Sequence, residues 1–519
     1  MVLQHLLSIL IWLPIFGALF LLLLQKITGR DLWVKWAGLA LSLIILALCV
    51  PLYQNLDQGT ANMQFVETYT WISALNIHYN LGVDGISVLF IILTAFTNVI
   101  IMLSSWRHIK TRVAEYMAIF LLATGITNGI FAAQDAILFY LFWEASMIPL
   151  YLGLGIWGME HRSYAALKFF LFNLLGSLMM LIAFICLYMV SGSFDFNHWM
   201  GLSLIGASQD WLFLALFVAF AVKIPMWPLH TWFADIHEQA PPGGSIVLAA
   251  LMLKVGAYGF LRLNLPIVPN ISSTLLMSVI VLSLIAVVYV GFASIAQKDM
   301  RRLIAYSSIS HMGIATLGIF MVLMIVVHNT GTALFPPHTD ALLSLQGAVF
   351  QLIAHAFASG ALFAMVMMLF ARFNSTKITS VVGLAKTMPI FAFFFVLFAM
   401  ANVGLPGTTG FVGEFFVILA ALNGNFWVAF VAAFTLILSP AYMLWWVKRS
   451  IFGAAPEEGA PEVKDIRGIE ILVLVLLALP VIIFGVYPAP ILNLSYAANA
   501  HIVDIVTFKV AALQPLLLK

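Results

Sequence analysis

The stretch Lys223-Ile224-Pro225-Met226-Trp227-Pro228 decides the fold, because it places a lysine and two prolines inside an apolar run from about 210 to 232. A run of that length suffices for a helix to cross a bilayer, which takes about 20 apolar residues. A proline removes one helical hydrogen bond and frees the carbonyl four residues earlier, here that of Ala221 or Ile224. A freed carbonyl is costly in lipid and must face protein or water. The stretch therefore predicts a membrane helix broken at Pro225 and Pro228.

The overall composition is that of an integral membrane protein. Of 519 residues, 63% are hydrophobic and 8% are charged, against about 25% charged in soluble proteins. The net charge of +2 excludes the basic face of a nucleic-acid-binding protein. The two cysteines form no CxxC pair, and no glycine-rich phosphate loop occurs, so the sequence predicts no metal, cluster, haem or nucleotide site in this chain.

Scanning for apolar runs of spanning length predicts an all-α bundle of fourteen transmembrane helices. The runs do not alternate polar and apolar residues, as strands of a membrane barrel would. The predicted helices lie near residues 3–24, 32–53, 82–104, 114–133, 135–157, 165–190, 210–232, 244–265, 272–296, 303–327, 344–371, 388–422, 426–447 and 469–487.

The basic residues of the loops predict the orientation of these helices. If the loops alternate sides, 18 of the 23 lysines and arginines fall on one side, which the positive-inside rule assigns to the cytoplasm. Fourteen crossings then place both termini on the opposite, periplasmic side. The 18 residues are Lys26, Arg30, Lys35, Arg107, Lys110, Arg112, Arg162, Lys168, Lys298, Arg301, Arg302, Arg372, Lys377, Lys386, Lys448, Arg449, Lys464 and Arg467.

The broken helices point to an internal repeat. The twelfth predicted helix is interrupted at Pro406-Gly407, and Pro406 frees the carbonyl of Asn402. When helices 4–8 and 9–13 are grouped as two fives, each broken helix is fourth in its group. Five is odd, so the groups are inverted, and such breaks are typical of an ion path near the midplane. The alternative is that the prolines kink their helices for packing alone.

This grouping divides the chain into four parts. Residues 1–113 would hold helices 1–3, residues 114–265 the first repeat and residues 272–447 the second. Residues 448–519 would hold a cytoplasmic loop, helix 14 and a C-terminal tail.

Four ionisable residues lie near helix centres, namely Glu144, Lys223, Lys254 and Glu414. Each costs about 3 kcal/mol on insertion scales, so each must face protein or water. We expect an ion pair between Glu144 and Lys223. Desolvation disfavours a charged lysine and a nearby carboxylate favours it, so a mobile pair could take up and release a proton. The alternative is a set of static structural ion pairs.

Two histidines extend the predicted path, His311 in the tenth helix and His355 in the eleventh. An imidazole can relay protons together with water. The alternative for each is a packed polar residue bonded to a neighbouring helix. His230 and His237, at the end of helix 7 and in the following loop, lie in no metal-binding pattern.

Three stretches resemble the antiporter-like membrane subunits of proton-pumping NADH–quinone oxidoreductase, respiratory complex I. They are Leu141-Phe142-Trp143-Glu144 with Pro149, the run from Lys223 to Pro241, and the run from Lys298 to His311. The resemblance covers essentially the whole chain. Within the family it is to the M type, because the chain ends too soon for the C-terminal arm of the L type. Glu414 also stands where the L and N types usually have lysine.

The resemblance implies a fold and roles for these residues. The fold is fourteen helices with two inverted five-helix repeats. Glu144 and Lys223 would form a coupled pair, Lys254 a central relay and Glu414 the exit-side acid, with His311 and His355 as relay histidines. One proton per cycle would cross from cytoplasm to periplasm.

The resemblance also implies a location and partners. The protein would lie in a bacterial inner membrane beside L-type and N-type antiporter-like neighbours. FMN, iron–sulfur clusters and quinone would belong to other subunits, with no cofactor in this chain. The same superfamily includes subunits of multi-subunit cation (Na⁺)/proton antiporters, which is the alternative function. A purely structural spacer is a third interpretation, opposed by the four buried charges.

Overall fold

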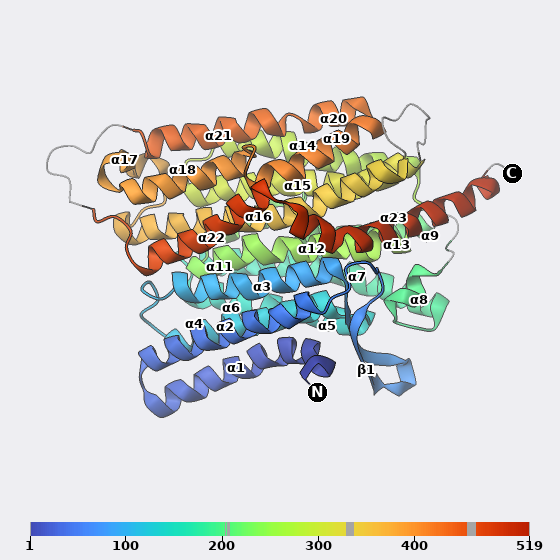
Figure 1. Ribbon diagram of the computed structural model, residues 1–519, viewed down its shortest axis with the longest axis horizontal. Helices are drawn as coiled ribbons and strands as arrows, with labels where there is room; N and C mark the ends of the chain where they lie inside the picture. The colour runs from blue at the N-terminus through green and yellow to red at the C-terminus, as the bar shows by residue number, and fades with distance from the viewer. Residues whose placement is uncertain (1, 203, 205–207, 328–336, 454–462, 518–519) are drawn as a thin grey trace.

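A computed structural model describes residues 2–202, 204, 208–327, 337–453 and 463–517. Its helices pack side by side in one elongated bundle, with α1 to α3 at one edge and α18 and α21 at the other (Figure 1). Among the described residues, twelve helices are long and apolar enough to cross a membrane. The two other predicted crossings, the seventh and the twelfth, are each divided into two shorter helices, as their prolines predicted.

The elements follow the predicted order. Twelve crossings are counted as single spans, although two of them consist of two helices that follow each other with a gap of at most two residues. They are α1 (Leu6–Thr28), α2 (Asp31–Gln54), α3 (Gly85–Ser104), α4 (Val113–Ala132), α5 with α6 (Ala136–Ala145, Met147–Trp157), α7 (Arg162–Ser191), the run α11 to α13 (Pro242–Ile267), α14 (Ser273–Ile295), α15 (Met300–Val327), α16 (Pro337–Phe373), α20 with α21 (Phe426–Ala432, Thr435–Ser450) and α22 (Ile469–Val486). The broken crossings are α9 (Ser208–Lys223) with α10 (Thr231–Gln239), and α18 (Pro389–Val403) with α19 (Thr409–Gly424). The remaining helices are the short α8 (Phe196–Met200) and α17 (Leu384–Thr387), and the long α23 (Ala489–Leu517).

The core lies around three long crossings at the centre of the bundle. In an apolar 18-residue stretch of each helix, all residues of Pro242–Ile267 and of α16 are buried, and 94% of those of α15. The buried share is only 28% for α2 and 33% for α22, whose outer faces are exposed. Polar groups on the three central crossings are therefore shielded from lipid by the other helices.

One freed carbonyl at each break is bonded within the protein. In the seventh crossing, the carbonyl of Ala221 accepts a hydrogen bond from the backbone N–H of Met226 at 2.9 Å. In the twelfth, the carbonyl of Asn402 accepts from the Ser439 hydroxyl at 3.1 Å. This satisfies the requirement that backbone polar groups at membrane depth find a partner.

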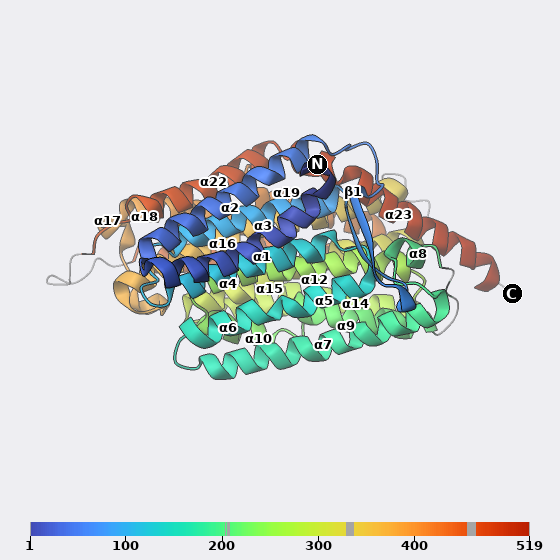
Figure 2. The same cartoon turned by 90° about the horizontal axis from the view of Figure 1, so that it is seen from below.

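Two elements were missing from the sequence-based prediction. Between the second and third crossings the chain forms an antiparallel hairpin of β1 (Gln64–Ile72) and β2 (Ile77–Val83). The third crossing consequently begins at Gly85, not at 82. The hairpin projects from the same end of the bundle as α23 (Figures 1 and 2), and we call this end the hairpin side. Glu67 of β1 is buried and accepts from the backbone N–H of Leu7 at 2.9 Å, which caps the start of α1.

The other missing element is α23, where we expected a C-terminal tail. This helix is 29 residues long and packs on α16 and α3. Its polar residues recur too often for a spanning run, which is why a search by hydropathy does not find it. The cytoplasmic loop expected at the start of the 448–519 part includes residues 454–462, which lie outside the described residues. The division into two inverted repeats rests on helix order alone and stays a prediction.

Candidate functional site

Lys254 lies at the centre of the eighth crossing, fully buried, after the π-helical turn η3 (Leu248–Met252). A π-turn shifts the helical hydrogen bonds by one residue. Lys254 Nζ donates to the carbonyl of Ala249 at 2.7 Å and lies 2.8 Å from His355 Nδ1. One of the two nitrogens in such a contact must accept the hydrogen bond, so it carries no proton of its own at that position. As long as this contact is present, Lys254 and His355 together therefore carry at most one positive charge.

Glu414 lies at the centre of a second buried cluster, formed by α15, α16 and α19. Its Oε1 is 2.7 Å from His311 Nδ1 and accepts from Gln351 Nε2 at 3.1 Å. Gly413 makes this possible, because a Cβ there would stand 2.7 Å from the Gln351 Cα atom. Only a residue without a side chain lets the two helices approach so closely.

The far side of the His311 ring is also held in place. Its Nε2 lies 3.3 Å from Asn402 Oδ1 and 3.3 Å from the Tyr442 hydroxyl. Asn402 is the residue whose carbonyl is freed by Pro406, so the break of the twelfth crossing and the ring of His311 share a partner. Gly404, in the same break, adopts φ +80°, a conformation that favours glycine. The break is therefore part of the site.

The two clusters meet at the histidines. The ring centres of His311 and His355 are 6.0 Å apart, a separation that a single water molecule can bridge. His355 Nε2 is buried and has no hydrogen-bond partner in the described parts of the chain. Four of the predicted residues, Lys254, His355, His311 and Glu414, are thus aligned through the buried centre of the bundle.

The expected Glu144–Lys223 ion pair is wrong in this structure. Lys223 Nζ instead donates to Ser146 Oγ at 3.1 Å and lies 4.7 Å from the centre of the Trp143 ring, a cation–π distance. Glu144 lies on a partly exposed side of α5, and its Oε1 has no hydrogen-bond partner within the described ranges. The reason is rotational, since residues 144 and 146 point about 200° apart around a helix.

Lys223 and Lys254 lie on different sides of the eighth crossing. Gly256 packs against the end of α9, where its Cβ would lie 2.8 Å from the Ile224 backbone nitrogen and 3.1 Å from Lys223 Cβ. Lys254 is two positions earlier, about 200° around the helix, and faces α16. A transfer between Lys223 and Lys254 must therefore pass around this helix.

Sequence reasoning missed two buried groups near the site. His237, which we expected in a loop, is part of α10 and is fully buried. It stacks 4.2 Å from the ring of Phe363 on α16, and neither ring nitrogen has a hydrogen-bond partner among the residues described. Its burial comes from the packing of α10 on α7 and α15 and from the ring contact with Phe363, so no local pattern marks it.

The second missed group is an ion pair on the hairpin side. Asp84 caps α3 and pairs with Arg262. Both are buried. Arg262 also donates to the Ser87 hydroxyl at 3.3 Å, so the pair ties the eighth crossing to α3.

Comparison with known proteins identifies the chain. The family described as "NADH:quinone oxidoreductase/Mrp antiporter, TM" matches residues 133–439, which include all six predicted relay residues. The chain is 42% identical over 518 residues to NADH-quinone oxidoreductase subunit M of Rhodobacter capsulatus, covering 96% of this chain and 97% of that protein. The chain belongs to the NADH-quinone oxidoreductase subunit M family.

Solved structures share the fold of this chain. A chain of respiratory complex I from Thermus thermophilus with bound NADH matches with a TM-score of 0.83 and 29% identity, covering 96% of this chain and 99% of that one. The Mrp complex from Dietzia sp. DQ12-45-1b matches with a TM-score of 0.78 and 19% identity, covering 98% of this chain and 56% of that one. The second likeness shows the fold alone. The predicted family is confirmed: the chain is a multi-pass, antiporter-like, proton-translocating membrane subunit of complex I.

Proposed function

We propose that this subunit M moves protons from cytoplasm to periplasm along Lys223, Lys254, His355, His311 and Glu414, one per catalytic cycle of the complex. The observation that carries the proposal is the buried line of contacts from the Lys254–His355 bond to the His311–Glu414 bond. NADH oxidation and quinone reduction, with FMN, iron–sulfur clusters and quinone, belong to other subunits.

The contacts suit proton transfer within the Lys254–His355 and His311–Glu414 pairs. The Lys254–His355 pair shares a donor and an acceptor nitrogen 2.8 Å apart, so a proton can move between them without a change in backbone position. An imidazole accepts a proton on one ring nitrogen and releases one from the other. His311 has a partner on each nitrogen, with Glu414 on the first. Glu414 receives the proton and passes it to the periplasmic side.

Glu144 acts on Lys223 through its charge. A carboxylate near a lysine favours the protonated ammonium, even where the two are not bonded. Because Glu144 lies on a partly exposed side of α5, a neighbouring L-type or N-type subunit can change its surroundings during the cycle. Such a change alters how tightly Lys223 holds its proton.

The orientation follows from the loop charges. The 18 basic residues of one side face the cytoplasm of a bacterial cell, and both termini face the periplasm. Protons then enter on the basic side and leave on the hairpin side of the inner membrane.

The test is proton pumping by the assembled complex in sealed vesicles. We expect Glu144→Gln and Lys223→Ala to lower NADH-driven acidification severalfold at equal amounts of assembled complex. The matched controls are Glu160→Gln and Lys26→Ala, which alter exposed residues and should pump normally. Wild-type pumping by both test variants would contradict the proposed relay.

A further inference from the structure

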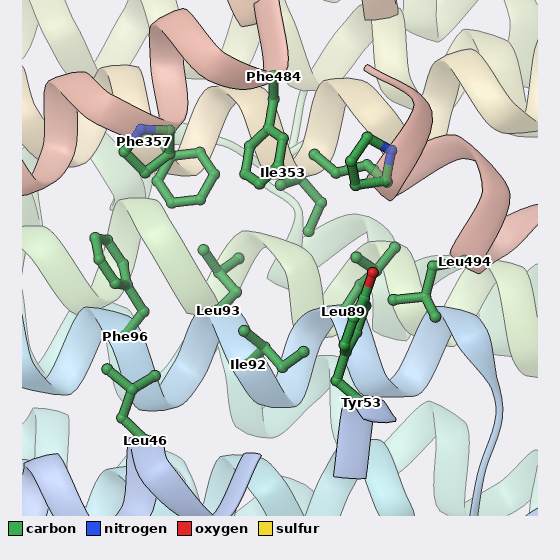
Figure 3. Close-up of a pocket in the computed structure, with 13 residues that line it drawn as sticks. Leu46, Tyr53, Leu89, Ile92, Leu93, Phe96, Ile353, Phe357, Phe484 and Leu494 are labelled. Carbon is green, nitrogen blue, oxygen red and sulfur yellow. The ribbon is translucent and has the colours of Figure 1, made fainter. Parts of the chain in front are cut away.

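An apolar groove of about 450 Å³ opens between α2 and α3 on one wall and α22 and α23 on the other (Figure 3). Its floor is α16. Leu93 and Phe96 of α3 point across the groove toward Phe357 of α16 and Phe484 of α22 (Figure 3). Leu494 of α23 lies at the other end of the groove, near Leu89. The groove is distinct from the relay, because no residue of the relay lines it.

The lining has only one polar group. Apart from Tyr53, the lining residues are leucine, isoleucine, phenylalanine and proline. Tyr53 lies one residue before the end of α2, on the hairpin side. Tyrosines favour this depth because their hydroxyl groups reach the polar interface. The groove follows α3 from Leu89 to Phe96, about 10 Å along the helix axis. That is about two-thirds of one leaflet's hydrocarbon depth of about 15 Å.

The size and chemistry of the groove select its occupant. Apolar cavities stay dry, which excludes ordered water. One turn of a helix 11 Å wide fills about 500 Å³, so the groove holds less than one turn of a neighbouring helix. A peptide in any other conformation would need partners for its backbone, and the single Tyr53 hydroxyl cannot supply them. An unbranched hydrocarbon chain is narrower and needs none.

We propose that the groove binds one acyl chain of a phospholipid from the leaflet on the hairpin side. The ester end of the chain lies at the Tyr53 hydroxyl, and its methylene groups run inward to Phe96 and Phe357. Charged side chains are absent from the lining, so binding does not depend on an anionic headgroup.

The site places a lipid chain directly behind the relay helix. Ile353 and Phe357 line the groove and stand two positions before and two positions after His355 on α16. Residues two apart point about 200° away from each other. His355 therefore meets Lys254 on one side of α16 while the acyl chain packs on the other. The bound chain adds packing contacts on this side of α16, where Phe357 already meets Phe96 and Phe484.

The test uses the intact complex in phosphatidylcholine vesicles in which one acyl chain carries a diazirine near its middle. After irradiation, mass spectrometry maps the adducts on this subunit. We expect adducts at Leu93, Phe96 and Phe484 to exceed those on the exposed face of α7 severalfold. An even distribution over both surfaces would overturn the proposal.

The second part of the test uses a variant whose side chain fills the groove. Leu93→Trp places a larger side chain in the groove and should lower adducts at Phe484 severalfold. Ile182→Trp adds a similar bulk on α7, where Ile182 is 53% exposed, and should leave them unchanged. Equal labelling of Phe484 in both variants would overturn the proposal. Efficient cross-linking of a Leu93→Cys variant to another subunit would also overturn the proposal, because a protein would then occupy the groove.

Discussion

Replacing Gly413 by alanine should separate the two helices that carry the Glu414 cluster. Gly413 of α19 faces Gln351 of α16, and an added Cβ would stand 2.7 Å from the Gln351 Cα and backbone nitrogen. These are backbone atoms, so no side-chain rotation relieves the contact. The helices themselves must move.

The size of the movement follows from ordinary contact distances. Non-bonded carbons pack at about 3.5–4.0 Å, so the helices must part by about 1 Å. The Gln351–Glu414 bond, now 3.1 Å, would lengthen to about 4 Å, beyond hydrogen-bond range. Overpacking of this kind costs about 1–3 kcal/mol of folding free energy. A 1 Å displacement of reacting groups can slow a reaction by about 100-fold, so we expect proton pumping to fall at least tenfold.

The assay compares pumping with assembly in the same preparation. NADH-driven acidification of sealed vesicles is divided by the amount of assembled complex, measured on native gels. Gly360→Ala is the matched control, because a Cβ at Gly360 would meet nothing closer than an Ile246 methyl at 4.0 Å. It adds the same methyl group to a neighbouring buried helix and should pump normally.

The result that refutes this reasoning is specific. If Gly413→Ala assembles normally and pumps like Gly360→Ala, the close approach of α19 to α16 is not needed for the relay. If both variants lose pumping equally, any added methyl group in this region is harmful and the Glu414 geometry has no special role.

Two further predictions concern the hairpin side. Asp84→Asn removes one partner of the buried pair with Arg262 and should cost about 3–5 kcal/mol of stability, read as a lower thermal midpoint of assembly. Asp504→Asn, at an exposed site, should not change that midpoint. Burial lowers the pKa of Lys509 in α23 from 10.5 to about 8. Between pH 8 and pH 10.5 the unfolded state therefore binds more protons than the folded state. The docking of α23 should then become more stable as the pH rises from 8 to 10.5. Hydrogen exchange of the α23 amides, corrected for the intrinsic exchange rates, measures this pH dependence. Lys509→Met should abolish it. If the protection of α23 still rises with pH in that variant, Lys509 is not the source of the pH dependence.

Much of the fold could be predicted because its causes are local in the sequence. The cost of exposing backbone and charge to lipid makes each spanning run and each proline break visible in a window of about 20 residues. The hairpin and α23 were not predicted, because neither is a continuous apolar run. Their stability comes from contacts elsewhere, such as Glu67 at the start of α1 and α23 on α3.

The sequence by itself determined which charged residues must be shielded from lipid, namely Glu144, Lys223, Lys254 and Glu414. Only the tertiary structure decided their partners. Lys254 meets His355 across 101 residues, and His311 meets Glu414 across 103. Lys223 meets Ser146 in place of Glu144. The physical reason is that burial cost depends on residue type and depth, whereas a contact depends on how each helix is rotated by packing against all its neighbours.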